Sequence, residues 1–456
     1  MQTQIFMVHK RHLGLRAPTV LAVGFALTIL VGALVLMLPV SAADGQITPF
    51  LDALFTAASA SCVTGLVTVS TAVHWSVFGK CVILLLIQIG GLGFMSVAAI
   101  ASFVLRRTIT LHERMVMSAG LNLSDGGGIV RLTRRVLFGT FIIEGTGAVL
   151  LSCRFVPHYG FPKGITMGVF HAVSAFCNAG FDLMGTPDDP FQSLIGWAED
   201  PLVNITVMAL IVLGGLGFFV WSDVWDKHSF CRLRLHTKIV LTATAGLLLF
   251  GFGWTLLFEW SNPATLGAFD TPHKLLAAAF ESVTLRTAGF NTIDLGALTG
   301  PSQAVSCLLM FIGGSPGSTA GGVKTGTAAV LVLTAISAFC GRTTVSAFGR
   351  TIAPRSIMNA VTLLMAGGVL CLVGACAIAG IEDAPFHQCL FEAVSAFGTV
   401  GVSMGLTPTL AAASRVILIV MMYMGRVGVL TLGVAVFMRR REPPRLKYPD
   451  ADVFIG

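Results

Sequence analysis

Charged residues are scarce in this chain of 456 residues: they make up 11% of it, against about 25% in a soluble domain. The ten cysteines include no Cys-x-x-Cys pair and several lie in apolar runs, which excludes a disulfide framework or a zinc site. A cleavable signal peptide is also missing, because the first apolar run, 20–40, lacks a convincing cleavage site and is long enough to span a bilayer. With 55% hydrophobic residues, the composition predicts a polytopic membrane protein.

The basic residues lie in short blocks between apolar stretches, although the net charge of +7 would also suit nucleic-acid binding. This distribution indicates membrane topology, so we expect no nucleic acid as a partner. By the positive-inside rule, both termini are cytoplasmic in a multi-pass protein of the cell (inner) membrane. The blocks are Lys10, Arg11 and Arg16; Arg106, Arg107 and Arg114; Arg131, Arg134 and Arg135; Lys227, Arg232, Arg234 and Lys238; Arg342, Arg350 and Arg355; and Arg439, Arg440, Arg441, Arg445 and Lys447.

One short pattern occurs four times. An apolar run that begins at a phenylalanine ends at Gly65, Gly180, Gly289 and Gly401, which are 115, 109 and 112 residues apart. The third copy is one residue shorter between its phenylalanine and its glycine. This period is far longer than the roughly 20–50 residues of a solenoid repeat, so it predicts a repeated membrane module.

Each copy lies between two apolar stretches that are near or above the roughly 20 residues needed to cross the hydrocarbon. The runs that lead to the glycines have about 10–14 residues, too few to cross, and predict re-entrant half-helices. The sequence therefore predicts an all-α membrane protein of four parallel helix–pore loop–helix repeats, with eight transmembrane spans and four re-entrant half-helices in a pseudo-fourfold ring. The first spans are expected near 17–40, 136–156, 239–260 and 357–380, and the second spans near 76–104, 202–225, 302–340 and 414–438. The segments are a cytoplasmic N-terminus (1–16), repeat 1 (17–104), repeat 2 (131–226), repeat 3 (236–340) with a loop at 313–327, repeat 4 (355–438) and a cytoplasmic C-terminal tail (439–456).

The four glycines are candidates for a cation filter. Glycine accepts backbone conformations that a Cβ forbids, so neighbouring carbonyls can point toward one axis and replace the water shell of a cation. The alternative is close helix packing, which glycine also serves in membranes; recurrence at matching positions favours the filter. The candidate filter residues are Cys62, Val63, Thr64 and Gly65; Cys177, Asn178, Ala179 and Gly180; Arg286, Thr287, Ala288 and Gly289; and Gly398, Thr399, Val400 and Gly401.

Four stretches resemble the Trk/Ktr/HKT potassium-uptake superfamily: Ser61–Leu66, Gln88–Phe94, Arg286–Asn291 and Gly317–Thr325. Eight spans and a tail that ends at Phe454-Ile455-Gly456 look like the membrane (B-type) subunit of the Ktr branch. The resemblance implies potassium bound at backbone carbonyls, and glycine at all four filter positions favours that ion. The implied carbonyls are those near Val63, Thr64, Asn178, Ala179, Thr287, Ala288, Thr399 and Val400.

The resemblance also implies partners. It predicts a homodimer in which each protomer has its own pore, resting on a cytosolic RCK-type ring of nucleotide-binding regulatory subunits. Sodium is a candidate activator, and any nucleotide would act only through the regulatory partner. The basic loops and tail would also suit acidic membrane lipid, so both kinds of contact stay open.

The second span of the third module is interrupted by proline and glycines that cannot continue a helix. A nucleotide P-loop is one reading, but Val323 separates Gly322 from Lys324 and so breaks the required motif. We expect instead a flexible loop that blocks the pore beneath the filter, and the family resemblance makes this loop the gate. The candidate gate residues are Gly313, Gly314, Ser315, Pro316, Gly317, Lys324 and Arg426.

Arg426 stands where the first two modules have glycine, and Gly314 is the matching residue of the third. An arginine at this depth is costly, by at least about 2.5–3.5 kcal/mol, and usually faces a cavity or a partner. A purely structural arginine bonded to loop carbonyls is the alternative. We favour a fixed positive charge that opposes cations and hydrogen-bonds the closed loop.

Other residues give weaker signals. Glu144 suits helix packing against a neighbouring backbone better than a proton relay, and Arg286 suits bracing of a loop better than ion contact. His171 and Lys324 have no role assignable from sequence. The residues Asp52, Glu281 and Glu392 are expected near the starts of half-helices, where they suit the helix dipole and would draw cations to the outer mouth.

The favoured function is channel-like, potassium-selective uptake without covalent chemistry, so the chain is not expected to be an enzyme. The competing function is a sodium- or proton-coupled secondary transporter with alternating access, which inverted repeats would favour. The sequence does not give the sodium dependence, the turnover, the nucleotide sensed or the resting state of the gate.

Overall fold

The computed structural model describes residues 17–93, 129–429, 431 and 433. The expected N-terminus (1–16), the C-terminal tail (439–456) and most of the last turns of two second spans (94–104 and 430–438) lie outside these residues. Four long helices match the expected first spans and are apolar enough to cross a membrane. They are α1 (Ala17–Leu36), α6 (Ile129–Tyr159), α10 (Leu235–Glu259) and α14 (Pro354–Ala379).

Each long helix is followed by a half-helix of 13 or 14 residues. Proline begins all four: it is the N-cap of three and lies in the first turn of the other, where its missing N–H costs nothing. The half-helices are α2 (Phe50–Cys62), α7 (Lys163–Phe176), α11 (Thr271–Thr284) and α15 (Phe386–Gly398).

The second spans are broken more widely than the sequence predicts. The expectation of a continuous helix over 202–225 is wrong: α8 (Pro201–Gly215) and α9 (Phe218–Lys227) meet at 93°. The cause is Gly217, whose φ of 94° a helix does not allow. Gly93 and Gly428, with φ of 83° and 90°, likewise end α3 (Val77–Leu92) and α16 (Ala412–Val427).

The third module has the break that the sequence predicts. Its second span divides into α12 (Gly300–Phe311) and α13 (Thr325–Phe339). By length, the described helices give four crossings, or five if the bent pair α8–α9 counts as one. The arrangement of eight spans stays a prediction.

A small hairpin departs from the all-α expectation. Strands β1 (Ser346–Ala347) and β2 (Arg350–Thr351) pair antiparallel. They are joined by Phe348 and Gly349, which both have positive φ, the conformation of a tight two-residue hairpin turn. Short 3-10 turns complete the described structure: Pro39–Ser41, Ile195–Trp197, Phe230–Arg232, Leu266–Ala268, Leu295–Ala297 and Thr407–Thr409.

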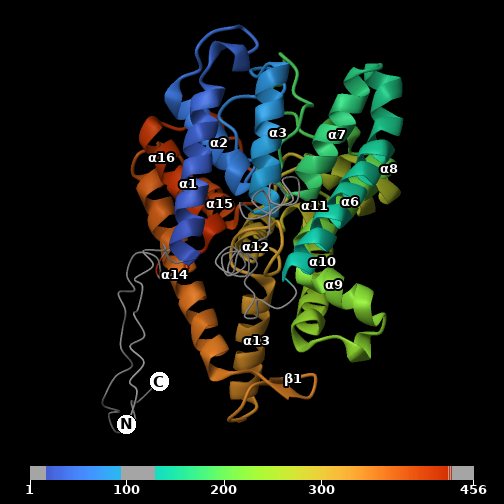
Figure 1. Cartoon of the computed structure of the whole chain (residues 1–456), viewed down its shortest axis with the longest axis vertical. Helices are drawn as coiled ribbons and strands as arrows, with labels where there is room; N and C mark the ends of the chain where they lie inside the picture. The colour runs from blue at the N-terminus through green and yellow to red at the C-terminus, as the bar shows by residue number, and fades with distance from the viewer. Residues whose placement is uncertain (1–16, 94–128, 430, 432, 434–456) are drawn as a thin grey trace, which may run out of the picture.

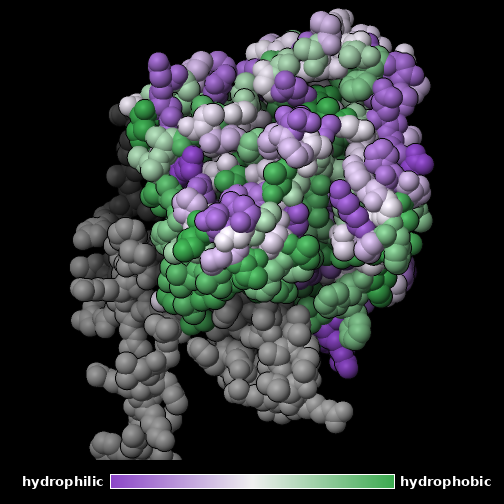
Figure 2. Space-filling view, turned by 90° about the horizontal axis from the view of Figure 1, so that it is seen from above, coloured by the Kyte–Doolittle hydropathy of each residue, from purple (hydrophilic) through white to green (hydrophobic). Residues whose placement is uncertain are grey.

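The half-helices are the core of the molecule. Nine residues of α2 and nine of α15 are buried, whereas the long helices α1, α6, α10 and α14 leave many large apolar side chains exposed. Figure 2 shows broad hydrophobic areas between polar patches on one face. Exposed apolar helix faces around a buried centre suit a hydrocarbon environment.

Contacts between modules follow a closed order. The helix after each filter loop packs on the half-helix of the next module: α3 on α7, α8 on α11, α12 on α15, and α16 back on α2. In Figure 1, α9, α13 and the hairpin lie together at one end of the molecule. The basic blocks at 227–238 and 342–355 belong to these segments.

Candidate functional site

The four candidate filter loops, which end at Gly65, Gly180, Gly289 and Gly401 and are called filter loops below, share one backbone conformation. In each, the glycine and the residue two before it have positive φ, a pairing found at Val63/Gly65, Asn178/Gly180, Thr287/Gly289 and Thr399/Gly401. Positive φ is uncommon for residues with a Cβ and rare for β-branched ones. The third loop therefore keeps the same register at the glycine despite its shorter half-helix run.

A hydroxyl braces each loop from the half-helix. Ser59 accepts the N–H of Gly65 at 3.0 Å and Ser395 accepts that of Gly401 at 3.1 Å. Ser174 and Thr284 donate to the carbonyls of Phe181 and Phe290 at 2.7 and 2.6 Å, as Ser395 does to Val402 at 2.7 Å. Sequence reasoning missed these hydroxyls, although a Ser or Thr five or six residues before each glycine is a signal that could have found them.

The four loops meet in a closed circle. A Cβ added to Gly65 would lie 2.6 Å from the carbonyl oxygen of Ala179, and one on Gly180 would lie 2.8 Å from that of Ala288.

The circle continues through the other two modules. A Cβ on Gly289 would lie 2.7 Å from the oxygen of Val400, and one on Gly401 would overlap the oxygen of Thr64. Only glycine fits where backbones approach this closely.

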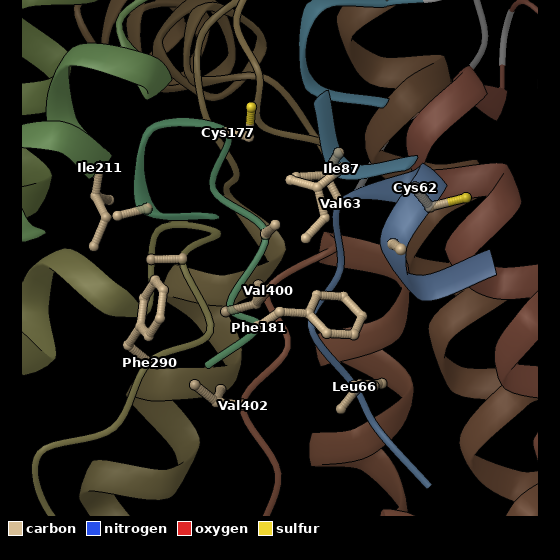
Figure 3. Close-up of a cluster of buried hydrophobic side chains, with 14 of the residues drawn as sticks. Cys62, Val63, Leu66, Ile87, Cys177, Phe181, Ile211, Phe290, Val400 and Val402 are labelled. Carbon is tan, nitrogen blue, oxygen red and sulfur yellow. The ribbon is translucent and has the colours of Figure 1, made fainter. Parts of the chain in front are cut away.

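The side chains that follow the glycines are buried in the protein. Leu66, Phe181, Phe290 and Val402 are all almost fully buried, and Figure 3 shows them among apolar side chains that include Ile87 of α3 and Ile211 of α8. Between the second and third loops, the Asn178 amide and the Thr287 hydroxyl lie 3.1 Å apart and hydrogen-bond. The irregular backbone of the four loops is thus enclosed by protein, as it would need to be within a membrane.

The loop between α12 and α13 has a fixed base. Ile312, just after α12, and Val323, just before α13, form a parallel β-bridge that holds the two ends of the loop together. Arg286, from the third filter loop, donates to the carbonyl of Gly313 at 3.3 Å and to Thr325 Oγ1 at 2.9 Å. The expected bracing role of Arg286 thus has a partner: its guanidinium contacts the base of the broken span.

The tip of this loop rests against the second module. Ser315 N–H and Thr319 N–H donate to the carbonyls of Gly215 and Gly214 at 3.0 and 3.3 Å, and Phe218 N–H donates to Gly317 at 2.9 Å. The break at Gly217 frees these groups, because a continuous helix would have used them internally.

The loop also lies beneath the fourth filter loop. A Cβ on Gly322 would come within 3.1 Å of Gly398, and Gly321 faces Thr399. Within the filter loops, the residues that it contacts come before the filter glycines. The loop between α12 and α13 therefore covers one side of the circle of glycines.

Arg426 joins the loop to the first module. Its guanidinium donates to the carbonyls of Thr319 and Gly90, and to that of Gly91 at 3.2 Å. Lys324 Nζ donates to Ala320 at 2.6 Å. Two basic side chains therefore donate to carbonyls of this loop, and the bonds from the charged Arg426 guanidinium are of the strong, charge-assisted kind.

Two residues that sequence reasoning left open have clear partners. Glu144 accepts bonds from the Gln88 amide at 3.2 and 3.3 Å and contacts Cys177 Sγ at 3.8 Å, so it packs against side chains rather than against a backbone. His171 bridges the carbonyl of Met167 at 2.8 Å and the N–H of Leu183 at 3.3 Å. Accepting at one nitrogen and donating at the other requires the neutral ring.

The expectation for the three acids holds only in part. Asp52 does lie in the first turn of α2 and pairs with Arg415 at 2.7 Å. Glu281 and Glu392 lie well inside α11 and α15, because these helices begin earlier, at their proline turns. Glu392 is buried and hydrogen-bonded to Ser403, Met404 and Thr407, so it does not face an outer mouth.

The described residues contain no group of three or more His, Cys, Asp or Glu side chains that could hold a metal ion directly. What the four loops do present where they meet is main-chain oxygens, those of Thr64, Ala179, Ala288 and Val400. Such oxygens bind a cation without a net charge of their own.

Comparison with known proteins gives consistent matches over nearly the whole chain. Residues 10–442 match the family model described as TrkH, cation transport protein. The chain is 42% identical to the Ktr system potassium uptake protein B of Bacillus subtilis and 40% identical to the potassium/sodium uptake protein NtpJ of Enterococcus hirae, in each case over 96% of both chains. The crystal structure of the potassium transporter TrkH from Vibrio parahaemolyticus matches with a TM-score of 0.70 at 17% identity, covering 94% of this chain and 86% of that one.

Proposed function

Because the chain belongs to the TrkH family of cation transport proteins, which are transporters and not enzymes, we propose that it takes up potassium through a selective, channel-like pore. The observation that carries the proposal is the closed circle of four glycine loops with one shared backbone conformation. The names of the two relatives, a potassium and a potassium/sodium uptake protein, support the choice of ion.

The ion is held by main-chain oxygens. The carbonyls of Thr64, Ala179, Ala288 and Val400 are those at the contacts between neighbouring loops, and the carbonyls near Val63, Asn178, Thr287 and Thr399 form the layer before them. The hydroxyl braces keep the oxygens in place, so the cage does not collapse onto a smaller ion. Glycine at all four positions leaves the axis free of side chains.

The four modules form a pseudo-fourfold ring of eight spans in parallel orientation. The cyclic packing of α3, α8, α12 and α16 on the next half-helix supports the ring. The basic segments gathered at one end support a cytoplasmic location for that end. The basic blocks in the sequence near the two termini support the same side for both.

The loop 313–327 is the gate. It covers the side of the circle that contacts the residues before the glycines, and Arg426 and Lys324 hold its carbonyls. In this closed position the positive charge of Arg426 opposes a cation, and opening requires that the Arg426 bonds break.

The chain works as a homodimer on a cytosolic RCK-type regulatory ring that binds the nucleotide. The name of the first relative, protein B of a Ktr system, supports a further subunit. Sodium acts as an activator, or is coupled to uptake in the competing transporter mechanism that the potassium/sodium relative supports.

Growth of a transport-deficient strain on limiting potassium, with and without a co-expressed regulatory subunit, tests the function. Rescue by the chain, with flux into liposomes that follows the potassium gradient alone, is the expected result. Uptake that requires a sodium or proton gradient would instead establish coupled transport, and failure of well-folded protein to carry potassium would contradict both.

A further inference from the structure

Two segments from different modules, 227–238 and 342–355, meet at the basic end of the molecule. The first contains the turn between α9 and α10, and the second contains the hairpin β1–β2 between α13 and α14. The rings of Phe230, in the turn, and Phe348, in the hairpin, pack edge to face with their centroids 6.0 Å apart. This aromatic contact joins the two segments into one surface.

Both rings are also open to the surroundings. Phe230 is 46% exposed and Phe348 is 50% exposed. Phe348 has a φ of 50°, a conformation that is a genuine outlier for a bulky residue, and a turn of this type favours Asn before the glycine. Neither burial nor the turn explains a phenylalanine at position 348, which points to a contact with something outside the chain.

A lysine lies over this aromatic pair. The Nζ atom of Lys238 is 5.7 Å from the ring centroid of Phe230 and 5.8 Å from that of Phe348, within the range of a cation–π interaction. It also donates to the carbonyl of Cys231 at 2.9 Å. Because an ammonium group has three donors, Lys238 is held in place by the protein and still has N–H groups to offer to a ligand.

The charge of the two segments has one sign. They contain four and three Lys or Arg residues and no Asp or Glu. The nearest acids in the sequence, Asp223 and Asp226, already form ion pairs with other basic side chains. Arg232 and Arg350 are exposed and have no acidic partner among the described residues. This surface therefore suits an anionic ligand.

The surface lies where apolar helices begin and end. The hairpin ends three residues before Pro354, the first residue of α14, which is long and apolar enough to cross a membrane. Phe339, at the end of α13, and Met358, near the start of α14, are exposed apolar side chains, and Figure 1 shows the hairpin at the end of α13. Aromatic and basic side chains at such a level are typical of the boundary between hydrocarbon and headgroups.

We propose that this surface binds an acidic phospholipid of the cytoplasmic leaflet, with Lys238, Arg232 and Arg350 at its phosphate headgroup and the rings of Phe230 and Phe348 against its glycerol and upper acyl chains. The positive-inside rule explains the number of basic residues, but it requires neither a lysine over two rings nor a phenylalanine in the turn. The proposal rests on the proposed function only for the orientation of this end toward the cytoplasm, and not for the ion carried.

Native mass spectrometry of the full chain in detergent, titrated with dioctanoyl phosphatidylglycerol or dioctanoyl phosphatidylcholine, tests the site. The acidic lipid should bind more tightly than the zwitterionic one. Lys238→Gln should weaken binding of phosphatidylglycerol about fivefold, the contribution of one basic residue at an acidic membrane surface, and should leave binding of phosphatidylcholine unchanged.

Lys274→Gln is the matched control. Lys274 also lies over a ring, 5.0 Å from the centroid of Trp260, and donates to the Trp260 carbonyl at 3.0 Å. It lies in the first turn of α11, beside the exposed Asp270 and outside the two basic segments. Its replacement should therefore leave the binding of both lipids as in the wild type.

Phe348→Asn separates the ring from the fold of the hairpin. Asn-Gly is the preferred pair for this turn, so the hairpin is kept while the aromatic contact is lost. Binding of both lipids should fall severalfold, because the ring contacts parts that the two lipids share. Phe348→Tyr, which keeps an aromatic ring, should bind both lipids as the wild type does.

Equal binding of the two lipids by the wild type, or unchanged binding of phosphatidylglycerol by Lys238→Gln, would overturn the proposal. If Lys238→Gln does not fold, Arg350→Gln decides in its place, because Arg350 is exposed on β2. Loss of a co-expressed regulatory subunit from purified Lys238→Gln, with phosphatidylglycerol binding unchanged, would assign the surface to that partner and refute the lipid site. None of these measurements needs ion flux, so failure of the proposed transport function would be seen separately, in the growth and liposome assays.

Discussion

At the residue scale, the proposed filter depends on the residues that surround its four glycines. The four glycines could be found from the sequence because they recur at matching positions of the repeats. They recur because a Cβ does not fit where the four loops meet. The hydroxyls of Ser59, Ser174, Thr284 and Ser395 were missed, because a Ser or Thr in an apolar helix usually bonds its own helix. Only the fold shows that these four bond the loop instead.

The first prediction concerns Gly65→Ser. Positive φ already disfavours a side chain here, and the new Cβ would press on the Ala179 oxygen, so the oxygen cage distorts. We expect a potassium-to-sodium flux ratio at least about tenfold lower, which corresponds to about 1.4 kcal/mol. Gly45→Ser is the control, because Gly45 also has positive φ but has open space around it.

An equal loss of selectivity in both variants would indicate general strain, and no loss in Gly65→Ser would remove Gly65 from the filter. The measurement is a matched potassium and sodium flux in liposomes.

The second prediction concerns Arg426→Ala. Loss of charge-assisted bonds to the loop destabilises the closed gate, and each such bond contributes about 1.5–3 kcal/mol. Potassium flux without a regulatory subunit should therefore rise at least about tenfold. Arg426→Lys keeps the positive charge but replaces the guanidinium and its several N–H donors by one ammonium group. Its flux should therefore lie between those of the wild type and of Arg426→Ala.

Unchanged flux from folded Arg426→Ala would assign the arginine a structural role alone. Equal flux in the Lys and Ala variants would show that the hydrogen bonds, and not the charge, close the pore.

At the element scale, the first spans follow from the sequence because of their apolar length, and the half-helices because a short apolar run ends at a glycine in every module. The break of the second module was missed, since Gly214-Gly215-Leu216-Gly217 is apolar and reads as a continuing span. The starts of the half-helices were misplaced: Glu281 and Glu392 directly follow Phe280 and Phe391, which begin the apolar runs in the sequence, whereas α11 and α15 begin earlier, after Asp270 and Pro385.

The third prediction compares two glycines that interrupt second spans. Gly217 and Gly93 both combine a positive φ with an extended ψ, a conformation that costs a residue with a Cβ about 1–3 kcal/mol. A Cβ on Gly217 would also press on the Pro316 oxygen at 2.8 Å, whereas a Cβ on Gly93 would have no atom of the described residues within 4 Å. Gly217→Ala should therefore raise the flux of the closed protein, and Gly93→Ala should not.

Both variants should lose similar thermal stability in detergent. If Gly217→Ala and Gly93→Ala raised the potassium flux equally, backbone strain at the interrupted helix would control the gate. The contact between Gly217 and the loop 313–327 would then not be needed.

At the scale of the whole molecule, the parallel repeats predict that both loops flanking each module face the cytoplasm. The acidic segment at Asp188 should then face outward and the segment around Thr343, before the hairpin, inward. In a cysteine-free background, Asp188→Cys should react with an impermeant maleimide in intact cells, and Thr343→Cys only after permeabilisation. Labelling of both in intact cells would contradict the parallel arrangement.

The central claim is that four glycine loops hold a potassium ion at their main-chain oxygens. Crystals of the protein grown with rubidium or thallium in place of potassium test it most directly, through the anomalous signal of the heavier ion. The account predicts a peak on the axis between Gly65, Gly180, Gly289 and Gly401. An empty circle, with ordered ion density elsewhere in the chain, would contradict it.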